Sequence, residues 1–268
     1  MTSLSNLGGV YVLAGRFLEA IQILETALST QERIIGQEHP DFLRTSNNLA
    51  NAYFQAGRYN QSIELNRKTL DIQERILGPE HPDTLSTKNN LAAVYDSDGR
   101  SQDAIDLNQE LLSIHQRVSG YEHPDTLSSY NNLAVAFCGA GRFEEAIAIY
   151  QNNLEARQRV LGPSHPDTLG SRGNLASAYD TTKRFAEAIR LHKENLEIMK
   201  RILGPEHPRT LSSLNNLGNS YRNTGKRREA ALILEETLSA MERVLGSNHP
   251  DTQVVRNNLS LLYRDMKR

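Results

Sequence analysis

The sequence predicts an all-α protein, a solenoid of repeated helical hairpins, and three observations support this prediction. A His-Pro dipeptide recurs every 42 residues, and an Asn-Leu pair keeps the same step. Within each period, the apolar residues fall mostly at helical spacing. A fixed period of roughly 20–50 residues indicates supersecondary units that stack on one another. We therefore expect one continuous array over 1–268.

The repeat that begins after Gly78 shows how each hairpin is encoded. Gly78 can end the preceding helix in the left-handed conformation, and the proline after it prevents continuation. Pro82 suits the first position of a new helix, and the aspartate after it meets the positive end of the helix dipole. We expect the first helix of the hairpin, helix A, over 82–97. We expect the second, helix B, over 102–119, after a turn at Gly99.

Helix B of this repeat carries an apolar face that we expect to pack on helix A. Its residues are Ala104, Ile105, Leu107, Leu111, Leu112, Ile114 and Val118. Ala92 on helix A and Ala104 on helix B have small counterparts in the other repeats, such as Gly8 and Gly218. We expect these small residues to lie where two helix backbones approach closely.

The composition bounds the class of protein. The chain is 38% hydrophobic and 23% charged, which is typical of a folded protein, and its net charge is −2. That charge argues against a nucleic-acid partner, which usually requires a strongly basic face. Cys138 is the only cysteine, so an intramolecular disulfide is excluded and a reducing compartment fits best. We read no signal peptide or membrane span, and we expect a cytoplasmic location.

The pattern N-L-A-x-x-Y-x-x-x-G-R-F-x-E-A-I, present almost whole at 132–147, resembles the tetratricopeptide repeat. The longer unit, with HPDTL before NNLA, resembles kinesin light chain and the repeat arrays of bacterial and fungal NB-ARC-type signalling proteins. The resemblance covers the whole chain. It implies a right-handed superhelical solenoid that binds a protein or peptide partner without catalysis.

This alignment divides the array into repeats at 1–36, 37–78, 79–120, 121–162, 163–204 and 205–246, with a final helix in 247–268. Four residues depart from the pattern near the junction of repeats 5 and 6: Gly173, Lys183, Arg209 and Arg227. These departures question the local rigidity there and leave the fold prediction unchanged. In the final helix we expect Leu259, Leu262 and Tyr263 to pack, and Arg256, Arg264, Lys267 and Arg268 to face water.

No catalytic motif emerges from the sequence, and we expect neither an enzyme nor a cofactor. HExxH and CxxC motifs are absent. Residues 218–226 resemble a phosphate loop only superficially, because the spacing and the helical setting are wrong. The histidine of each His-Pro pair could be read as a metal ligand. Helix entry is the favoured interpretation, because one histidine per repeat keeps the six apart.

An arginine near the end of helix B recurs in every repeat. The six are Arg33, Arg75, Arg117, Arg159, Arg201 and Arg243. A cation suits the negative end of the helix dipole, and we expect pairing with the acidic start of the following helix. We interpret these arginines as structural rather than ligand-binding.

The second asparagine of each Asn-Asn pair is our candidate for peptide binding. In the tetratricopeptide fold helix A lines the concave surface, so the resemblance implies a series of exposed amides. The series comprises Asn48, Asn90, Asn132, Asn174 and Asn216. An amide offers a donor and an acceptor to a peptide backbone. The alternative is that each amide bonds only to the adjacent helix or to water. For the first asparagines, Asn47, Asn89, Asn131 and Asn215, we favour a structural role.

Non-repeated residues on the same helix face would supply specificity. We assign Arg44, Asn51, Ser86, Ser128, Val135, Ser177, Asn219 and Arg222 to this surface. Asp96 and Asp180 are its acidic exceptions. The hypothesis is a peptide with modest apolar side chains at its centre and an acidic group near one end.

Two alternatives stay open. The chain could be the sensor segment of a larger signalling ATPase, which the missing start of the first repeat favours. It could also self-associate through the first helix, where Leu4, Leu7, Val10 and Tyr11 are apolar.

Overall fold

The computed structural model describes residues 2–267, and within them it contains thirteen α-helices and no strand. The fold is an all-α repeat solenoid, as predicted. The A helices are α1 (Thr2–Leu13), α3 (Pro40–Gln55), α5 (Pro82–Ser97), α7 (Pro124–Gly139), α9 (Pro166–Thr181), α11 (Pro208–Asn223) and α13 (Pro250–Lys267). The B helices are α2 (Phe17–Ile35), α4 (Tyr59–Ile76), α6 (Ser101–Ser119), α8 (Phe143–Val160), α10 (Phe185–Leu203) and α12 (Arg227–Leu245).

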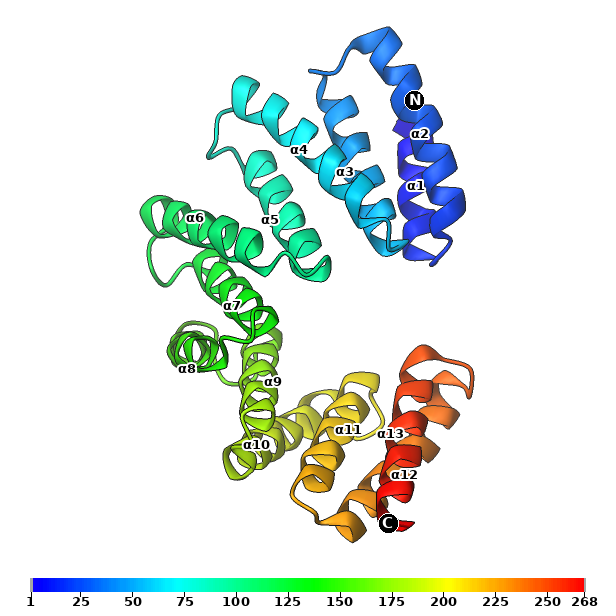
Figure 1. The fold of residues 1–268 in the computed structure, drawn as a ribbon, viewed down its shortest axis with the longest axis vertical. Helices are drawn as coiled ribbons and strands as arrows, with labels where there is room; N and C mark the ends of the chain where they lie inside the picture. The colour runs from blue at the N-terminus through cyan, green and yellow to red at the C-terminus, as the bar shows by residue number, and fades with distance from the viewer. Residues whose placement is uncertain (1, 268) are drawn as a thin grey trace. The chain divides into compact units, whose positions relative to one another are not determined.

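The chain forms two compact units, which we describe separately. The N-terminal unit is Met1–Gly141 and contains α1 to α7, and the C-terminal unit is Arg142–Arg268 and contains α8 to α13. Within each unit, helices that follow one another in sequence pack side by side and are joined by short turns (Figure 1). That the repeats form one continuous array over 1–268 stays a prediction.

Each repeated histidine caps the start of an A helix. In all six copies the ring Nδ1 accepts a hydrogen bond from the backbone N–H two residues later, at 3.1–3.3 Å. This contact satisfies one of the backbone donors that a helix start leaves unpaired. Helix entry, the favoured interpretation of these residues, is confirmed.

The turn between helices A and B needs a left-handed residue. Gly99 occupies it with φ of +77°, and Lys183 occupies the equivalent position with φ of +61°. A side chain in this conformation costs about 1–2 kcal/mol. Lys183, which replaces the usual glycine of this turn, therefore keeps the turn conformation at a cost in backbone strain.

The small residues lie where the hairpin helices meet. Ala92 and Ala104 are buried, as predicted. A Cβ added at Gly8 would lie 2.4 Å from Leu24 Cγ, and one at Gly218 would lie 2.8 Å from Leu234 Cγ. The glycine therefore admits a leucine from helix B. The counterparts of that leucine in repeats 2 to 5 are Asn66, Asn108, Tyr150 and His192, all buried.

Two side chains expected in the core are exposed. Val118 is 61% exposed, although Ile114, one turn earlier on the same face, is buried. The packing of α6 therefore ends before its last turn. In α13, Leu259 and Leu262 are buried as predicted, but Tyr263 is 41% exposed. Its hydroxyl donates to Glu235 instead of entering the core. Arg268 lies outside the described residues.

For three of the repeated arginines, Arg75, Arg117 and Arg243, the expected partner is wrong. Arg75 pairs with Glu38 at 2.7 Å, and Arg243 pairs with Glu206 at 2.6 Å. Each glutamate precedes the His-Pro pair that opens the same hairpin. The reason is geometric: the end of helix B in an antiparallel hairpin lies beside the entry to its own helix A. These pairs are exposed, so each contributes less than about 1 kcal/mol.

Candidate functional site

Ser86 and Asn90 of α5, which we assigned to the candidate surface, share a solvent-exposed side of the helix with Ala93 and Ser97. Ser86, Asn90, Ala93 and Ser97 are all exposed. Their spacing of three and four residues places them on one side of the helix. We call this side of the A helices the A-helix face.

Two candidate asparagines, Asn48 and Asn132, link consecutive A helices, and so does the equivalent residue of α13, Asn258. Asn132 Nδ2 donates to Asn89 Oδ1 at 3.5 Å, and Asn258 Nδ2 donates to Asn215 Oδ1 at 2.9 Å. Asn48 Nδ2 makes the equivalent contact with Ser5 Oγ at 3.4 Å. These bonds support the structural role that we favoured for the first asparagines. The same bonds occupy one N–H donor of the second asparagine in each pair. Bonding of these amides to the adjacent helix is the alternative that the sequence left open.

Two adjoining pockets lie between α5 and α7 on this face. The larger measures about 380 Å³ and includes Ser86 and Ser128 in its lining. The smaller measures about 210 Å³, and we call it the Asp96 pocket. Its lining residues are Phe54, Asn89, Ala92, Ala93, Asp96, Ser97, Asn108, Asn132, Val135 and Ala136. Asn89 and Asn132 line both pockets.

The pockets bring together four of the predicted site residues: Ser86, Ser128, Asn132 and Val135. The sequence reasoning missed Asn89, which lines both pockets although it was assigned a structural role. Asn89 has both roles: it lines the site, and its side-chain oxygen accepts the hydrogen bond that positions Asn132.

The other predicted residues are not among those that line these pockets. Arg44 lines a pocket of about 330 Å³ beside Asn47, and its side chain pairs with Asp41 at 2.7 Å. Asn51, Asn90, Ser177 and Asn216 are exposed, whereas Asn48, Asn174, Asn219 and Arg222 are half-buried. Within the described chain, Arg222 Nη1 and Asn219 Oδ1 are buried without a hydrogen-bond partner.

One A-helix position varies strongly between repeats. It is occupied by Val12, Phe54, Asp96, Cys138, Asp180, Arg222 and Arg264. The two aspartates lie 84 residues apart, which is two periods, and they have different surroundings.

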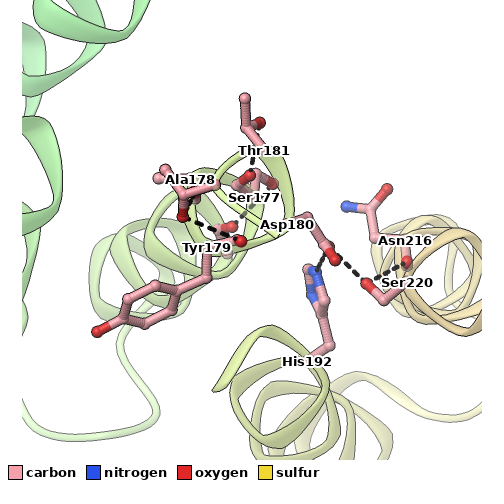
Figure 2. Close-up of polar contacts among 10 residues, drawn as sticks. Ser177, Ala178, Tyr179, Asp180, Thr181, His192, Asn216 and Ser220 are labelled. Carbon is pink, nitrogen blue, oxygen red and sulfur yellow. Dashed lines mark hydrogen bonds and ion pairs between the residues drawn. The ribbon is translucent and has the colours of Figure 1, made fainter. Parts of the chain in front are cut away.

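Asp180 has two partners in the C-terminal unit. Figure 2 shows its carboxylate between His192 of α10 and Ser220 of α11. Asp180 Oδ2 accepts from Ser220 Oγ at 2.5 Å and from His192 Nε2 at 3.4 Å. Both partner side chains are buried. The contact therefore ties α9, α10 and α11 together.

This cluster lacks the arrangement of a nucleophilic triad. In a triad the imidazole lies between the hydroxyl and the carboxylate, so that it can take the hydroxyl proton. Here the carboxylate lies between the other two groups. Among the described residues, no group of three His, Cys, Asp or Glu side chains could hold a metal ion.

Asp96 has no such partners in the N-terminal unit. Its Oδ1 is buried and accepts no hydrogen bond from the described part of the chain. Burial raises the pKa of this carboxyl above its usual value. Its Oδ1 lies against Gly139, where an added Cβ would come within 2.2 Å. The glycine therefore makes room for the carboxylate.

Comparison with known proteins identifies the repeat. The tetratricopeptide repeat model matches residues 1–59, 41–117, 103–150, 125–200 and 181–243. A solved structure from Podosopora anserina, described as kinesin light chain nearly identical TPR-like repeats, is 31% identical. The match covers 75% of this chain and 95% of that one, with a TM-score of 0.67. A search of curated proteins finds no significant match.

More distant structures share the fold alone. A Rap protein complexed with competence and sporulation factor is 11% identical, covers 98% of this chain and 75% of its own, and has a TM-score of 0.59. A signal transduction ATPase with a tetratricopeptide repeat sensor, from Pyrococcus horikoshii, is 16% identical with a TM-score of 0.65. That match covers 97% of this chain and 38% of the ATPase. The family match and the kinesin-light-chain likeness confirm the resemblance, and this chain belongs to the tetratricopeptide repeat family.

Proposed function

We propose that this protein is a scaffold that binds an extended segment of a partner protein on its A-helix face. The observation that carries the proposal is the pair of adjoining pockets between α5 and α7. They are lined by amide and hydroxyl side chains, which suit a peptide backbone, and by Val135 and Ala93, which suit small apolar side chains.

The family supports this class of function, because tetratricopeptide repeats mediate protein interactions and are generally non-catalytic. The Rap neighbour, which shares the fold, is complexed with competence and sporulation factor. The asparagines Asn48, Asn90, Asn132, Asn174 and Asn216 are the proposed backbone contacts.

The acidic group that we expect at one end of the partner has a candidate contact in α11. Arg222 Nη1 is a buried donor without an acceptor in the described chain. A carboxylate from the partner would satisfy it through a charge-assisted hydrogen bond. Asn51, Ser177 and Asn219 belong to the same proposed surface.

We further infer a cytoplasmic scaffold without enzymatic activity and without nucleic-acid or membrane partners. The net charge of −2 and the single cysteine support these assignments. None of the described helices is long and apolar enough to cross a membrane.

A displayed library of random peptides, selected on the purified chain, tests the proposal. Selected peptides are then titrated by calorimetry against the wild type, Val135→Arg and Gln109→Arg. Val135 lines the Asp96 pocket, whereas Gln109 is an exposed residue of the B helix α6. We expect affinity to fall about tenfold or more with Val135→Arg, because the larger charged side chain fills the pocket, and to stay unchanged with Gln109→Arg.

The asparagine series is tested in the same assay with Asn132→Ala/Asn174→Ala, after its helicity and melting are checked. Loss of binding supports contact through the amides. Equal binding to all variants, or no enrichment of any peptide, would contradict the proposed surface.

A second candidate is the sensor segment of a larger signalling ATPase. The fold likeness to the Pyrococcus horikoshii ATPase, whose repeats are a sensor, favours it. The reading frame upstream of residue 1 in the native transcript decides this point. A nucleotide-binding module in that frame would support the sensor role, and a stop codon directly upstream would exclude it.

Self-association is a further alternative outcome. Leu4, Leu7 and Val10 of α1 are exposed, at 41%, 41% and 57%. Sedimentation equilibrium gives the mass directly, and a monomer at high micromolar concentration would exclude association through α1.

A further inference from the structure

We propose that the Asp96 pocket is a subsite for a basic side chain, specifically an arginine, of the bound partner segment. The inference rests on the proposed function and adds the chemistry of one partner residue. It starts from the buried carboxylate oxygen of Asp96, which lacks a donor in the described chain.

A buried acceptor without a donor is costly, and a carboxylate more so than a neutral group. The equivalent carboxylate in the C-terminal unit, Asp180, also has a buried Oδ1 without a donor, but its other oxygen, Oδ2, accepts from His192 and Ser220. Two periods earlier, the corresponding positions hold Asn108 and Ala136. Both line the Asp96 pocket, and neither side chain donates to the carboxylate: Asn108 Nδ2 donates to the carbonyl of Ala104 at 2.9 Å, and the methyl side chain of Ala136 has no donor.

The pocket also has the size of a single side chain. At about 210 Å³ it is smaller than small-molecule sites, which measure roughly 300–1,000 Å³. Gly139 makes room for the carboxylate itself, because any larger residue there would displace Asp96 Oδ1. Asn223, the counterpart of Gly139 two periods later, carries a full side chain.

The lining favours a cation, and a guanidinium in particular. The lining contains one carboxylate and no Lys, Arg or His. Phe54 and Val135 supply apolar wall, and the side-chain oxygens of Asn89 and Asn132 supply further acceptors. A guanidinium is planar, weakly hydrated and carries five donors, so it tolerates such a wall better than an ammonium does. The nearest lysine on the same helix, Lys88, is already held by Glu74 and Glu110 at 2.8 and 2.5 Å.

Two short peptides that differ by one group test the subsite. The first is N-acetyl-Ala-Ala-Arg-Ala-Ala-amide, and the second has citrulline, a neutral isostere, in place of the arginine. Each is titrated into the isotopically labelled full chain, and NMR follows the side-chain amides of Asn108 and Asn132 and the methyl groups of Val135.

The arginine peptide is expected to shift these resonances in the wild type. The citrulline peptide is expected to bind with an affinity at least about tenfold lower, since a hydrogen bond to a charged group is lost. Asp96→Asn should weaken the arginine peptide by a similar factor. The matched control Asp106→Asn, which removes the same charge from an exposed site of α6, should leave its affinity unchanged.

Ala136→Ser gives an independent test that keeps the carboxylate. It places a hydroxyl where Ser220 stands beside Asp180, so Asp96 gains an internal donor and the arginine peptide should bind more weakly. Equal affinity for the arginine and citrulline peptides, or equal affinity of the wild type and Asp96→Asn, would overturn the subsite. That result would leave the scaffold proposal standing if library peptides still lose affinity with Val135→Arg.

Discussion

Asp96 and Asp180 occupy the same position of their repeats, and each has a buried Oδ1 without a donor in the described chain, yet only Asp180 accepts two hydrogen bonds through its Oδ2. Asp180 accepts hydrogen bonds from a histidine and a serine and joins three helices of the C-terminal unit. Asp96 lies in a pocket of the N-terminal unit, beside a glycine that makes room for it. The difference teaches that the role of a repeat residue depends on a few neighbours in adjacent helices. Four predictions test this comparison.

The largest expected effect is the loss of the partner on helix B. His192→Ala removes a buried ring and one donor to Asp180, so we expect the free energy of unfolding to fall by about 2–4 kcal/mol. Asn108→Ala, its counterpart, removes only a hydrogen bond within α6 and should cost about 1 kcal/mol. Urea unfolding measures both values. Equal losses would show that His192 does no more for Asp180 than Asn108 does for Asp96.

Removing the hydroxyl beside Asp180 should lower the stability of the protein, whereas adding a hydroxyl beside Asp96 should raise it. Ser220→Ala leaves Asp180 with one donor and should destabilise the protein by about 1–2 kcal/mol. Ala136→Ser adds the missing donor beside Asp96 and should stabilise it by about 1 kcal/mol. Thermal melts of the two variants show whether each change in stability relative to the wild type is a loss or a gain. Destabilisation by Ala136→Ser would mean that the added hydroxyl cannot reach the carboxylate.

The turns that follow the two aspartates differ at the residue that adopts the left-handed conformation. Gly99 adopts its left-handed conformation freely, whereas Lys183 holds the same conformation with a side chain. Lys183→Gly should therefore stabilise the chain by about 1 kcal/mol. Gly99→Lys, the reverse exchange, should destabilise it by a similar amount. The midpoints of urea unfolding measure both effects. Midpoints equal to that of the wild type in both variants would contradict the assigned backbone strain.

The smallest effect concerns pH. Burial raises the pKa of Asp96 above its ordinary value of 3.8, so the folded chain binds the proton more tightly than the unfolded chain. Stability contributed by this group therefore falls as the pH rises through the window just above 3.8. Asp96→Asn should be more stable than the wild type near pH 7, by about 1 kcal/mol or less, and equal to it below pH 3. If the free energies of unfolding of the wild type and of Asp96→Asn change in parallel with pH, Asp96 is not a buried carboxylate without a partner.

The helices were predictable because each repeat carries its own stop and start signals. Helix A of repeat 3 was expected over 82–97, and α5 is Pro82–Ser97. Val118 was placed wrongly because periodicity shows which face a residue shares and not where the neighbouring helix ends. The partner of Arg75 was also wrong, since spacing along the sequence does not reveal which loop lies beside a helix end.

The site was only partly predictable. Repeat alignment located the A-helix face and residues such as Ser86, Ser128 and Val135, which line the pockets. It missed the pairing of Asp180 with Ser220, because that contact depends on the register of two helices 40 residues apart. A signal was present: Ser220 stands in a series otherwise filled by Val10, Ala52, Val94, Ala136, Ala178 and Leu262.

The most direct test of this account is a ¹³C NMR titration of the Asp96 side-chain carboxyl, with and without the arginine peptide. The account predicts a pKa above the ordinary value in the free chain, and a lower pKa when the guanidinium is bound, because a cation favours the charged form. The citrulline peptide should leave the titration curve where it was. An Asp96 pKa at or below 3.8 in the free chain, unmoved by the arginine peptide, would contradict the account.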